Sequence, residues 1–466
     1  MESNKKKNIE NNRQEYEDTY DTLSFIGVEQ AREAEKIRDE LIGALAGYVT
    51  WGFNRTKLDC KNLSNGCRAC GEGTWSCLFI NGICNARCFY CPTAQPSKSE
   101  PMTHGISFVT PRDYVDYLRR FNFKGASISG GEPLLTFERT FRYISEIKRA
   151  LGDNIYLWLY TNGIPADREN LSRLKSAGLD EIRFDLSACR YQLDKVKMAV
   201  DIIPVVTVEI PAIPEDEALL KTVIEKIQRL GVSHLNLHQL RCTPYNRKNL
   251  VQRGYTFLHG PKIAVLESEL CALRTIRFVH ENNIGLPVNY CSFVYKHRYQ
   301  GAGLRRRLAP FYLKPYETIT ETGMIRKLSI KGTSDEMTAE ARRFESNGSL
   351  KDRWELSNAQ TRLYFHDTLC RHIDFATTPL FVTYFEPRMR PSPSFRNAFR
   401  EIRLNSKKRV YIEKTGVLLE KELSGETAHW FIKRFIQKQS DSTSMEPETA
   451  EIDEVENIKP GLQDYY

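Results

Sequence analysis

The chain alternates between short apolar segments and longer amphipathic ones. Segments such as 154–160, 180–187 and 202–210 are rich in β-branched and aromatic residues, which is typical of buried strands. Segments such as 219–230 carry an apolar residue every three or four positions and stop at a glycine, as helices do. At least six such strand-and-helix pairs lie between residues 74 and 290. This pattern predicts the α/β class, with a parallel sheet covered by helices as a partial (β/α)6 TIM-like barrel.

The pattern changes on both sides of the barrel. Apolar residues recur at helical spacing from Val28 to Leu45, and a cysteine-rich loop follows them. Late in the chain, 380–385 predicts a strand and 409–420 a hairpin that turns at Thr415–Gly416. The predicted organisation is a disordered segment at 1–20, a helix and cysteine-rich loop at 21–73, the barrel at 74–307, a small α+β domain at 310–437 and a disordered acidic tail at 440–466.

Composition bounds the class of protein. The chain has 466 residues, of which 41% are hydrophobic, enough for two main domains with a sizeable core. No apolar run approaches the roughly 20 residues that span a bilayer, and residues 1–20 lack the apolar segment of a signal peptide. We therefore expect a cytoplasmic protein without a membrane partner. In that reducing compartment, 12 cysteines indicate metal ligation rather than disulfides.

The formal net charge is +8, and much of the excess lies between Arg388 and Arg409. Such a basic stretch fits an acidic partner or nucleic acid. It also fits a solvated face on a basic protein, and the sequence leaves both interpretations open.

Cys84, Cys88 and Cys91 are separated by three and two residues, so one loop can direct three thiolates at a single centre. Thiolates are the preferred ligands of iron–sulfur clusters and of zinc. Three protein ligands on a four-iron cluster leave one iron open to a substrate or cofactor. We call residues 84–91 the cysteine loop.

A second set of cysteines precedes the cysteine loop. Glycines flank the inner pair of this set, Cys67 and Cys70, and let the backbone turn tightly around a metal. With Cys60 and Cys77 the set has four members, as in a tetrahedral zinc site or an auxiliary iron–sulfur cluster. Cys77 is the weakest member because it lies in an apolar segment that predicts a buried strand, where cysteine is common.

Polar residues mark the ends of several predicted strands. Gly130, Gly131, Glu132 and Pro133 follow the strand at 125–129, and the two glycines let backbone approach a ligand closely. Thr161, Asn162 and Gly163 end the next strand, where Asn-Gly is also an ordinary turn. Further along, Glu209 ends a strand, and alternation predicts that Asn236, His238 and also His234 face the barrel interior.

The Cys-x3-Cys-x2-Cys spacing, with Tyr90 before the last cysteine, resembles the radical S-adenosylmethionine (SAM) superfamily. Gly-Gly-Glu-Pro, some forty residues later, resembles the second motif of that superfamily. The resemblance implies a [4Fe-4S] cluster on Cys84, Cys88 and Cys91, with SAM on the open iron. It also implies that Glu132 and the backbone of the 130–133 loop hold the amino group of SAM, and that a flavodoxin- or ferredoxin-type donor supplies electrons.

Two narrower resemblances add site residues. In the pyruvate formate-lyase activating enzyme branch, segments like Thr161–Gly163 lie against SAM. The same branch has an Asp-Leu-Lys facing SAM where this chain has Asp185 followed by Ser187 instead of the lysine. From residue 66 to 307 the chain resembles uncharacterised prokaryotic Fe–S oxidoreductases, whose members carry a Cys67/Cys70-like pair and a cysteine like Cys291. This favours Cys291 over Cys77 at the auxiliary site.

The implied activity is that of a radical SAM enzyme. The resemblance implies reductive cleavage of SAM to a 5′-deoxyadenosyl radical, which abstracts hydrogen from a peptide, protein or small molecule. A glycyl-radical-enzyme activase is the alternative, although it would need neither an auxiliary centre nor a C-terminal domain. A non-enzymatic module using the same cysteines for structural zinc is an alternative of another class. The sequence does not single out a catalytic residue beyond the cofactor-binding positions.

Overall fold

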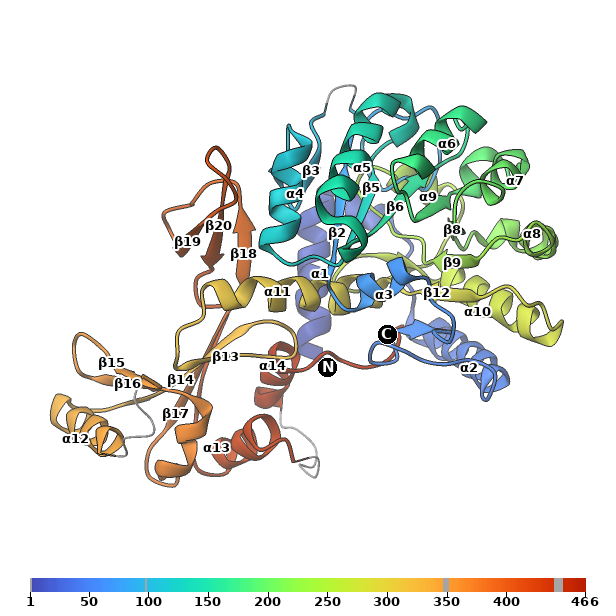
Figure 1. Cartoon of the computed structure of the whole chain (residues 1–466). Helices are drawn as coiled ribbons and strands as arrows, with labels where there is room; N and C mark the ends of the chain where they lie inside the picture. The colour runs from blue at the N-terminus through green and yellow to red at the C-terminus, as the bar shows by residue number, and fades with distance from the viewer. Residues whose placement is uncertain (1, 97–98, 347–351, 440–446) are drawn as a thin grey trace. The chain divides into compact units, whose positions relative to one another are not determined.

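The computed structural model describes residues 2–96, 99–346, 352–439 and 447–466. The chain forms two compact units (Figure 1). Unit 1 comprises residues 1–300 together with 460–466, and unit 2 comprises residues 301–459. In the described ranges, every helix is too short or too polar to span a bilayer.

Unit 1 is built on a ten-stranded sheet in the order β1-β12-β9-β8-β7-β6-β5-β2-β3-β4. The central strands run parallel to one another: β2 (Trp75–Phe79), β5 (Gly125–Ser129), β6 (Tyr156–Thr161), β7 (Glu181–Phe184), β8 (Val205–Pro211), β9 (His234–His238) and β12 (Val288–Cys291). The antiparallel edge strands are β1 (Lys57–Leu58), β3 (Met102–Thr103) and β4 (Ile106–Ser107). Because its edges stay unpaired with each other, the sheet is an open barrel, which confirms the predicted fold class and adds a seventh parallel strand.

Helices cover the outside of this curved sheet (Figure 1). The helices that follow the central strands are α4 (Pro111–Arg120), α5 (Phe137–Leu151), α6 (Arg168–Ser176), α7 (Asp194–Val200), α8 (Glu217–Arg229) and α10 (Leu266–Glu281). The predicted α2 (Val28–Leu45) packs on α10. Helix α8 shows the principle, because it buries Leu220, Val223, Ile224 and Ile227 and exposes its charged residues.

The prediction of disorder at 1–20 is wrong for the residues that the structure describes. Residues 2–16 form helix α1 (Glu2–Tyr16), and a short 3₁₀ segment follows it. Tyr16, Tyr20 and Leu23 lie in a buried cluster that contains Phe257. The side-chain amide of Asn12 donates to the carbonyl of Gly260 at 3.2 Å. Three apolar residues at spacings of three and four therefore anchor a segment whose average composition is polar.

The predicted tail at 440–466 also needs correction. Residues 440–446 lie outside the described ranges, but α14 (Pro447–Glu456) is a helix of unit 2. Residues 460–466 belong to unit 1, where the hydroxyl of Tyr465 donates to the buried carboxylate of Glu269 at 2.7 Å. Tyr465 is buried, and the buried side chain of Gln463 donates to the carbonyl of His259 at 2.5 Å, so both side chains fix this segment on unit 1.

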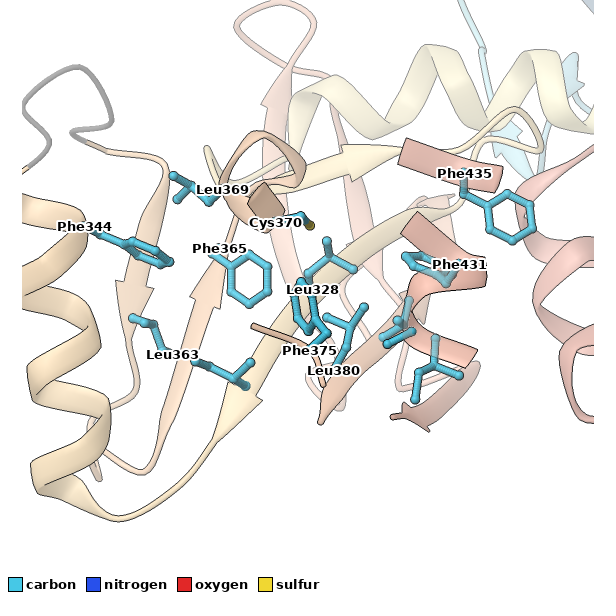
Figure 2. Packing of buried hydrophobic residues seen from close by; sticks show 14 of the residues in the cluster. Leu328, Phe344, Leu363, Phe365, Leu369, Cys370, Phe375, Leu380, Phe431 and Phe435 are labelled. Atoms are coloured by element: carbon cyan, nitrogen blue, oxygen red, sulfur yellow. The ribbon is translucent and has the colours of Figure 1, made fainter. Parts of the chain in front are cut away.

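Unit 2 is an antiparallel α+β structure. Its main sheet contains β13 (Glu317–Ile319), β14 (Ile325–Lys331), β15 (Trp354–Leu356), β16 (Arg362–Phe365), β17 (Leu380–Phe385) and β21 (Leu419–Leu423). The accompanying helices are α11 (Gly301–Leu308), α12 (Ser334–Glu345), α13 (Gly425–Phe431) and α14. Figure 2 shows the core, in which Leu328, Phe365 and Leu380 of the sheet lie near Phe431 of α13.

A second, three-stranded sheet of unit 2 has the order β18-β20-β19, with β18 (Pro387–Arg390), β19 (Ala398–Arg403) and β20 (Arg409–Lys414). The predicted hairpin at 409–420 is wrong, because its two arms belong to different sheets. Strand β20 pairs with β18 and β19, whereas β21 pairs with β17. Each arm alternates as a strand should, and alternation alone does not specify the partner.

Candidate functional site

The cysteine loop follows β2 at the carboxyl end of the parallel strands. Its three thiols are partly buried, and the amide of Cys91 donates to the carbonyl of Cys88 at 3.1 Å. Burial, together with the nearby charges of Asp185, Cys91 and Cys84, raises the pKa of the Cys88 thiol to about 12. A metal that binds here must therefore displace thiol protons.

The Gly-Gly-Glu-Pro segment lies directly against the start of the cysteine loop. The amide of Gly131 donates to the carbonyl of Asn81 at 3.0 Å, and the amide of Glu132 donates to the carbonyl of Ile83 at 2.7 Å. A Cβ atom on Gly130 would lie 2.4 Å from the Asn81 carbonyl oxygen, and one on Gly131 would lie 2.0 Å from that of Ile83. Both glycines are thus required by a backbone-to-backbone contact within the protein.

Glu132 ties this segment to the next strand end. Its buried carboxylate accepts hydrogen bonds from the amides of Leu134 at 2.9 Å and Asn162 at 2.7 Å, and from the hydroxyl of Thr161 at 2.8 Å. Burial raises the pKa of Glu132 to about 7, although these three donors act in the opposite direction. Pro133 follows and begins a short 3₁₀ turn.

Asn162 connects the same strand end to the cysteine loop. Its side-chain amide nitrogen lies 2.8 Å from Asn85 Oδ1 and 3.7 Å from Cys84 Sγ. Gly163 has a φ of +77°, and a Cβ atom there would lie 2.9 Å from the ring of Phe184. The Thr-Asn-Gly segment is therefore more than a turn, since it contacts both sequence motifs.

Tyr90 joins the cysteine loop to the end of β7. Its hydroxyl lies 2.9 Å from Asp185 Oδ2 and 2.6 Å from Ser187 Oγ, and Ser187 donates to Asp185 at 2.5 Å. Burial raises the pKa of Asp185, and the hydrogen bonds from Ser187 and Tyr90 lower it. Ser187 thus completes a contact between Asp185 and the aromatic residue of the cysteine loop.

These donors fit an iron–sulfur cluster in their chemistry. Three partly exposed thiols share one loop, and its flanking segments are held by backbone and side-chain bonds to β5, β6 and β7. Within the described ranges, no three side chains of His, Cys, Asp or Glu converge closely enough to hold a single metal ion.

The upstream cysteines lie on a different support. Helix α3 (Asn65–Gly71) carries Cys67 and Cys70, and the hydroxyl of Ser64 caps it by accepting from the amide of Cys67 at 3.1 Å. The helix packs tightly inside the barrel. A Cβ atom on Gly66 would lie 2.4 Å from the guanidinium of Arg183.

Cys60, Cys67 and Cys70 gather around Cys291 at the end of β12. Each of the three has its pKa raised first by burial and also by the nearby charge of Cys291. Cys77 differs, because its neighbours are Ser127 and Ser129 of the adjacent strand rather than another thiol. We call Cys60, Cys67, Cys70 and Cys291 the buried cysteine group.

Lys57 supplies a positive charge to this group. It is fully buried on β1, and its ammonium donates to Cys291 Sγ at 2.6 Å and to the side-chain oxygen of Asn289. Burial opposes ionisation of Cys291, but Lys57 and His238 outweigh it and lower the pKa of that thiol to about 6. Lys57 and His238 therefore favour the thiolate form of Cys291, which is the form that binds metals.

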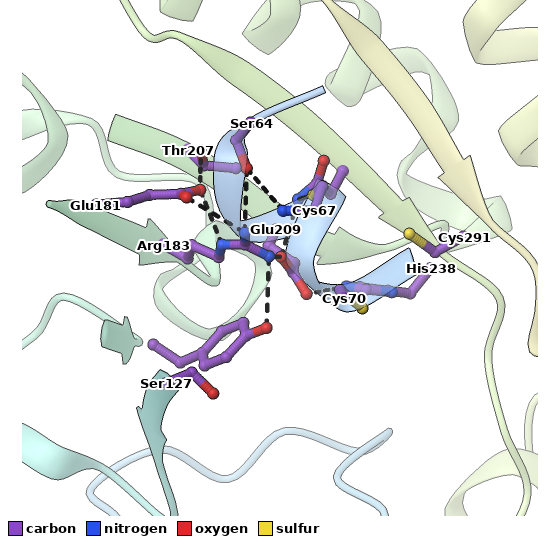
Figure 3. A network of polar contacts seen from close by, with 12 residues as sticks. Ser64, Cys67, Cys70, Ser127, Glu181, Arg183, Thr207, Glu209, His238 and Cys291 are labelled. Atoms are coloured by element: carbon purple, nitrogen blue, oxygen red, sulfur yellow. Dashed lines mark hydrogen bonds and ion pairs between the residues drawn. The ribbon is translucent and has the colours of Figure 1, made fainter. Parts of the chain in front are cut away.

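A charged network crosses the barrel interior beside the buried cysteine group (Figure 3). Arg183 donates to Glu181 at 2.8 Å and to Glu209 at 2.7 Å. Glu209 also lies 2.6 Å from His238 Nε2 and accepts from Asn236 at 2.9 Å. Burial would raise the pKa of Glu209, yet Arg183 and His238 hold it well below its usual value. The predicted inward orientation of Asn236 and His238 is confirmed.

Sequence reasoning missed Lys57 and Arg183. Arg183 carried a signal, because Glu181, Arg183 and Asp185 alternate with Ile182 and Phe184 and so must share the inner face of β7. Lys57 carried no such signal, because no feature of the neighbouring sequence distinguishes it from a surface lysine.

Comparison with known proteins gives a consistent family. Residues 78–197 match the family described as the Radical SAM superfamily. The chain is 32% identical over 301 residues to a Methanocaldococcus jannaschii protein named "Putative glycyl-radical enzyme activating enzyme MJ0021", in an alignment that covers 61% of this chain and 78% of that protein.

Two solved structures show weaker likeness. Streptococcus suis SuiB bound to its precursor peptide SuiA has 12% identity and a TM-score of 0.34, and the match covers 56% of this chain. This chain spans only 53% of the SuiB chain. Kitasatospora setae TsrM with cobalamin and a [4Fe-4S] cluster bound has 16% identity and a TM-score of 0.28, covering 37% of this chain and 38% of TsrM.

Proposed function

The chain belongs to the radical SAM superfamily and is an enzyme, and on that premise we propose that Cys84, Cys88 and Cys91 hold a [4Fe-4S] cluster to which SAM binds. Reductive cleavage of SAM at such a cluster supplies a 5′-deoxyadenosyl radical, which abstracts a hydrogen atom from the substrate. Family membership as an enzyme sets aside the interpretation of the chain as a non-enzymatic zinc module.

The observation that carries this proposal is the packing of the two motifs. The backbone bonds from Gly131 to Asn81 and from Glu132 to Ile83 fix the Gly-Gly-Glu-Pro segment beside the cysteine loop. A cofactor held by one motif is therefore within reach of the other. We assign the backbone of residues 130–133 to the amino group of SAM.

Glu132 has a positioning role in this proposal. Its carboxylate already accepts three hydrogen bonds inside the protein, so it holds the strand ends in place rather than serving mainly as a ligand. Thr161, Asn162 and Gly163 would lie against SAM, and Tyr90 with Asp185 would orient the last cysteine of the loop. A one-electron donor of the flavodoxin or ferredoxin type would reduce the cluster.

We further propose that the buried cysteine group holds an auxiliary centre, either an iron–sulfur cluster or zinc. Cys60, Cys67 and Cys70 each lie within electrostatic reach of Cys291, and Lys57 donates a hydrogen bond to the Cys291 sulfur. Cys77 is left out, since the groups that shift its pKa most after burial are Ser127, Glu209, Ser129 and Arg183 and not a thiol.

The substrate class is a peptide, a protein or a small molecule, and unit 2 and the auxiliary centre favour modification of a peptide or natural product. Activation of a glycyl-radical enzyme is the second candidate, and it is favoured by the name of the M. jannaschii relative. Either function uses the same SAM chemistry at the cysteine loop.

SAM cleavage tests the central proposal. The protein is reconstituted with iron and sulfide without oxygen, reduced with dithionite, and assayed for 5′-deoxyadenosine. We expect formation of 5′-deoxyadenosine by the wild type and none by Cys84→Ala. Zinc in place of iron at the cysteine loop, or intact SAM after reduction, would refute the proposal.

Metal content tests the auxiliary centre separately. The Cys67→Ala/Cys70→Ala variant should lose the second centre and retain the iron of the cysteine loop. Cys77→Ala serves as the matched control and should keep the wild-type content. Equal losses in both variants would contradict the ligand set proposed here.

A further inference from the structure

The three-stranded sheet of unit 2 concentrates the positive charge of the chain. Residues 387–414, which include all three strands, contain nine lysines and arginines and only two glutamates. Their net charge of +7 accounts for nearly all of the chain's +8. Positive charge concentrated in one small sheet is more typical of a surface that binds a polyanion than of a surface that only keeps the protein soluble.

Strand register places Arg388, Arg390, Arg403 and Arg409 on one face with Glu401 and Glu413, whereas Arg400 and Lys414 lie on the other face. Phe399 and Arg388 both oppose Glu413, Arg390 opposes Tyr411, and Arg403 opposes Arg409, so all these side chains point to the same side. The other side contains Ile402, Val410 and Ile412, which are buried. The sheet therefore has a packed inner face and an outer face of arginines and aromatic rings.

The aromatic rings on the outer face are unusually exposed. Phe395 is 81% exposed and Phe399 is 37% exposed. The ring centroids of Phe395 and Phe399 are 5.8 Å apart, and those of Phe399 and Tyr411 are 5.7 Å apart, both in edge-to-face contact. Such an exposed aromatic array has a free energy cost in water and is typical of a binding surface.

The loop that carries Phe395 is held in place by the protein. The buried carboxylate of Glu413 accepts from the amide of Ser394 at 2.5 Å and from the side chain of Asn397 at 3.3 Å. The other acid of the sheet, Glu401, accepts from Arg409 at 3.2 Å. Both carboxylates are thus used internally, while Arg396 and Arg403 form no ion pair within the described ranges.

We propose that this outer face binds single-stranded nucleic acid. Bases would stack on Phe395 and Phe399, and the phosphates would contact the arginines of β18, β19 and β20. The aromatic rings favour this partner over an acidic peptide, whose carboxylates have no use for them. They also favour a single strand over a duplex, because a duplex hides the faces of its bases. This binding is independent of the radical chemistry of unit 1.

Fluorescence anisotropy of the full-length protein with labelled 12-nucleotide oligomers tests the proposal. We expect single-stranded RNA or DNA to bind at about 0.15 M salt, and Phe399→Ala to weaken binding about tenfold. The matched control is Tyr48→Ala, which removes an exposed aromatic ring of unit 1 and should leave the affinity unchanged. Comparison of RNA with DNA identifies the kind of strand.

The charged residues have a separate signature. In Arg403→Ala, the slope of log Kd against log salt concentration should be smaller by about one, which corresponds to the loss of one phosphate contact. Arg343→Ala, which removes an exposed arginine of α12 paired with Glu340, should not change it. SAM cleavage and thermal unfolding of Phe399→Ala should match the wild type, which shows that the variant is folded.

Three outcomes would overturn the proposal. One is the absence of binding to any single strand. A second such outcome is an affinity that stays the same in Phe395→Ala and Phe399→Ala, because binding would then depend only on electrostatic attraction. The third is binding of duplex DNA or a polyglutamate peptide as tightly as a single strand.

Discussion

The cysteine loop and the buried cysteine group differ in how the chain assembles them. The cysteine loop is one contiguous segment, partly exposed and held mainly through neighbouring backbone. The buried cysteine group comes from the segment after β1, from α3 and from β12, and its side chains adjoin the buried charge of Lys57. The cysteines of the cysteine loop can therefore be replaced without unfolding the barrel. The buried cysteine group and the charges beside it, in contrast, contribute to the stability of the barrel.

Loss of a cysteine of the loop should produce the largest change in activity. We expect Cys88→Ala to abolish SAM cleavage because two protein ligands do not hold the cluster, while the free energy of unfolding of the metal-free protein changes by less than about 1 kcal/mol. Assay of 5′-deoxyadenosine and denaturant unfolding of the same preparation measure both. A large loss of stability would show that the loop is also structural.

Loss of Arg183 should produce the largest change in stability. Arg183→Met leaves Glu181 and Glu209 buried without their common cation, so we expect the free energy of unfolding to fall by roughly 3–5 kcal/mol. Arg87→Met, at an exposed position of the cysteine loop, is the control and should change it by less than about 0.5 kcal/mol. Similar losses of unfolding free energy in the two variants would show that the barrel interior and the cysteine loop do not differ in their contribution to stability.

Glu132 should give the protein a pH-dependent stability. Its pKa rises on folding from about 4.5 to about 7, so the folded state binds more protons in that range and this contribution to stability is lost as the pH rises through 7. The shift corresponds to at most about 3 kcal/mol. Denaturant unfolding at several pH values from 5 to 8 should show a smaller pH slope in Glu132→Gln than in the wild type. Identical pH slopes in Glu132→Gln and the wild type would contradict the assignment of this pH dependence to Glu132.

The Tyr90 hydroxyl should have the smallest effect. Tyr90→Phe removes its bonds to Asp185 and Ser187, and we expect a loss of about 1 kcal/mol in stability with a several-fold rise in the KM for SAM. Tyr191→Phe removes a comparable bond to Asp216 outside the site and should leave the KM unchanged. A rise in KM in both variants would assign the effect to general loosening of the strand ends.

The sequence predicted the open barrel. It also predicted that the cysteine loop and the Gly-Gly-Glu-Pro segment form one site, because both predictions depend on local motifs and their spacing. It did not predict Lys57 beside Cys291, since that contact joins residues 234 positions apart through pairing of β1 with β12. The helix at 2–16 was missed for a related reason. A few apolar residues at its end hold it, and average composition conceals them.

Gly130 and Gly131 contact the backbone that leads into the cysteine loop, and this contact is a requirement of the fold. The carbonyls of Asn81 and Ile83 exclude a Cβ atom at either glycine regardless of what the loop binds. A relative that had lost its cysteines and its catalysis would still need both glycines to keep this fold. The Gly-Gly pair therefore reports the backbone packing of this fold, and the cysteines report the capacity to hold a cluster.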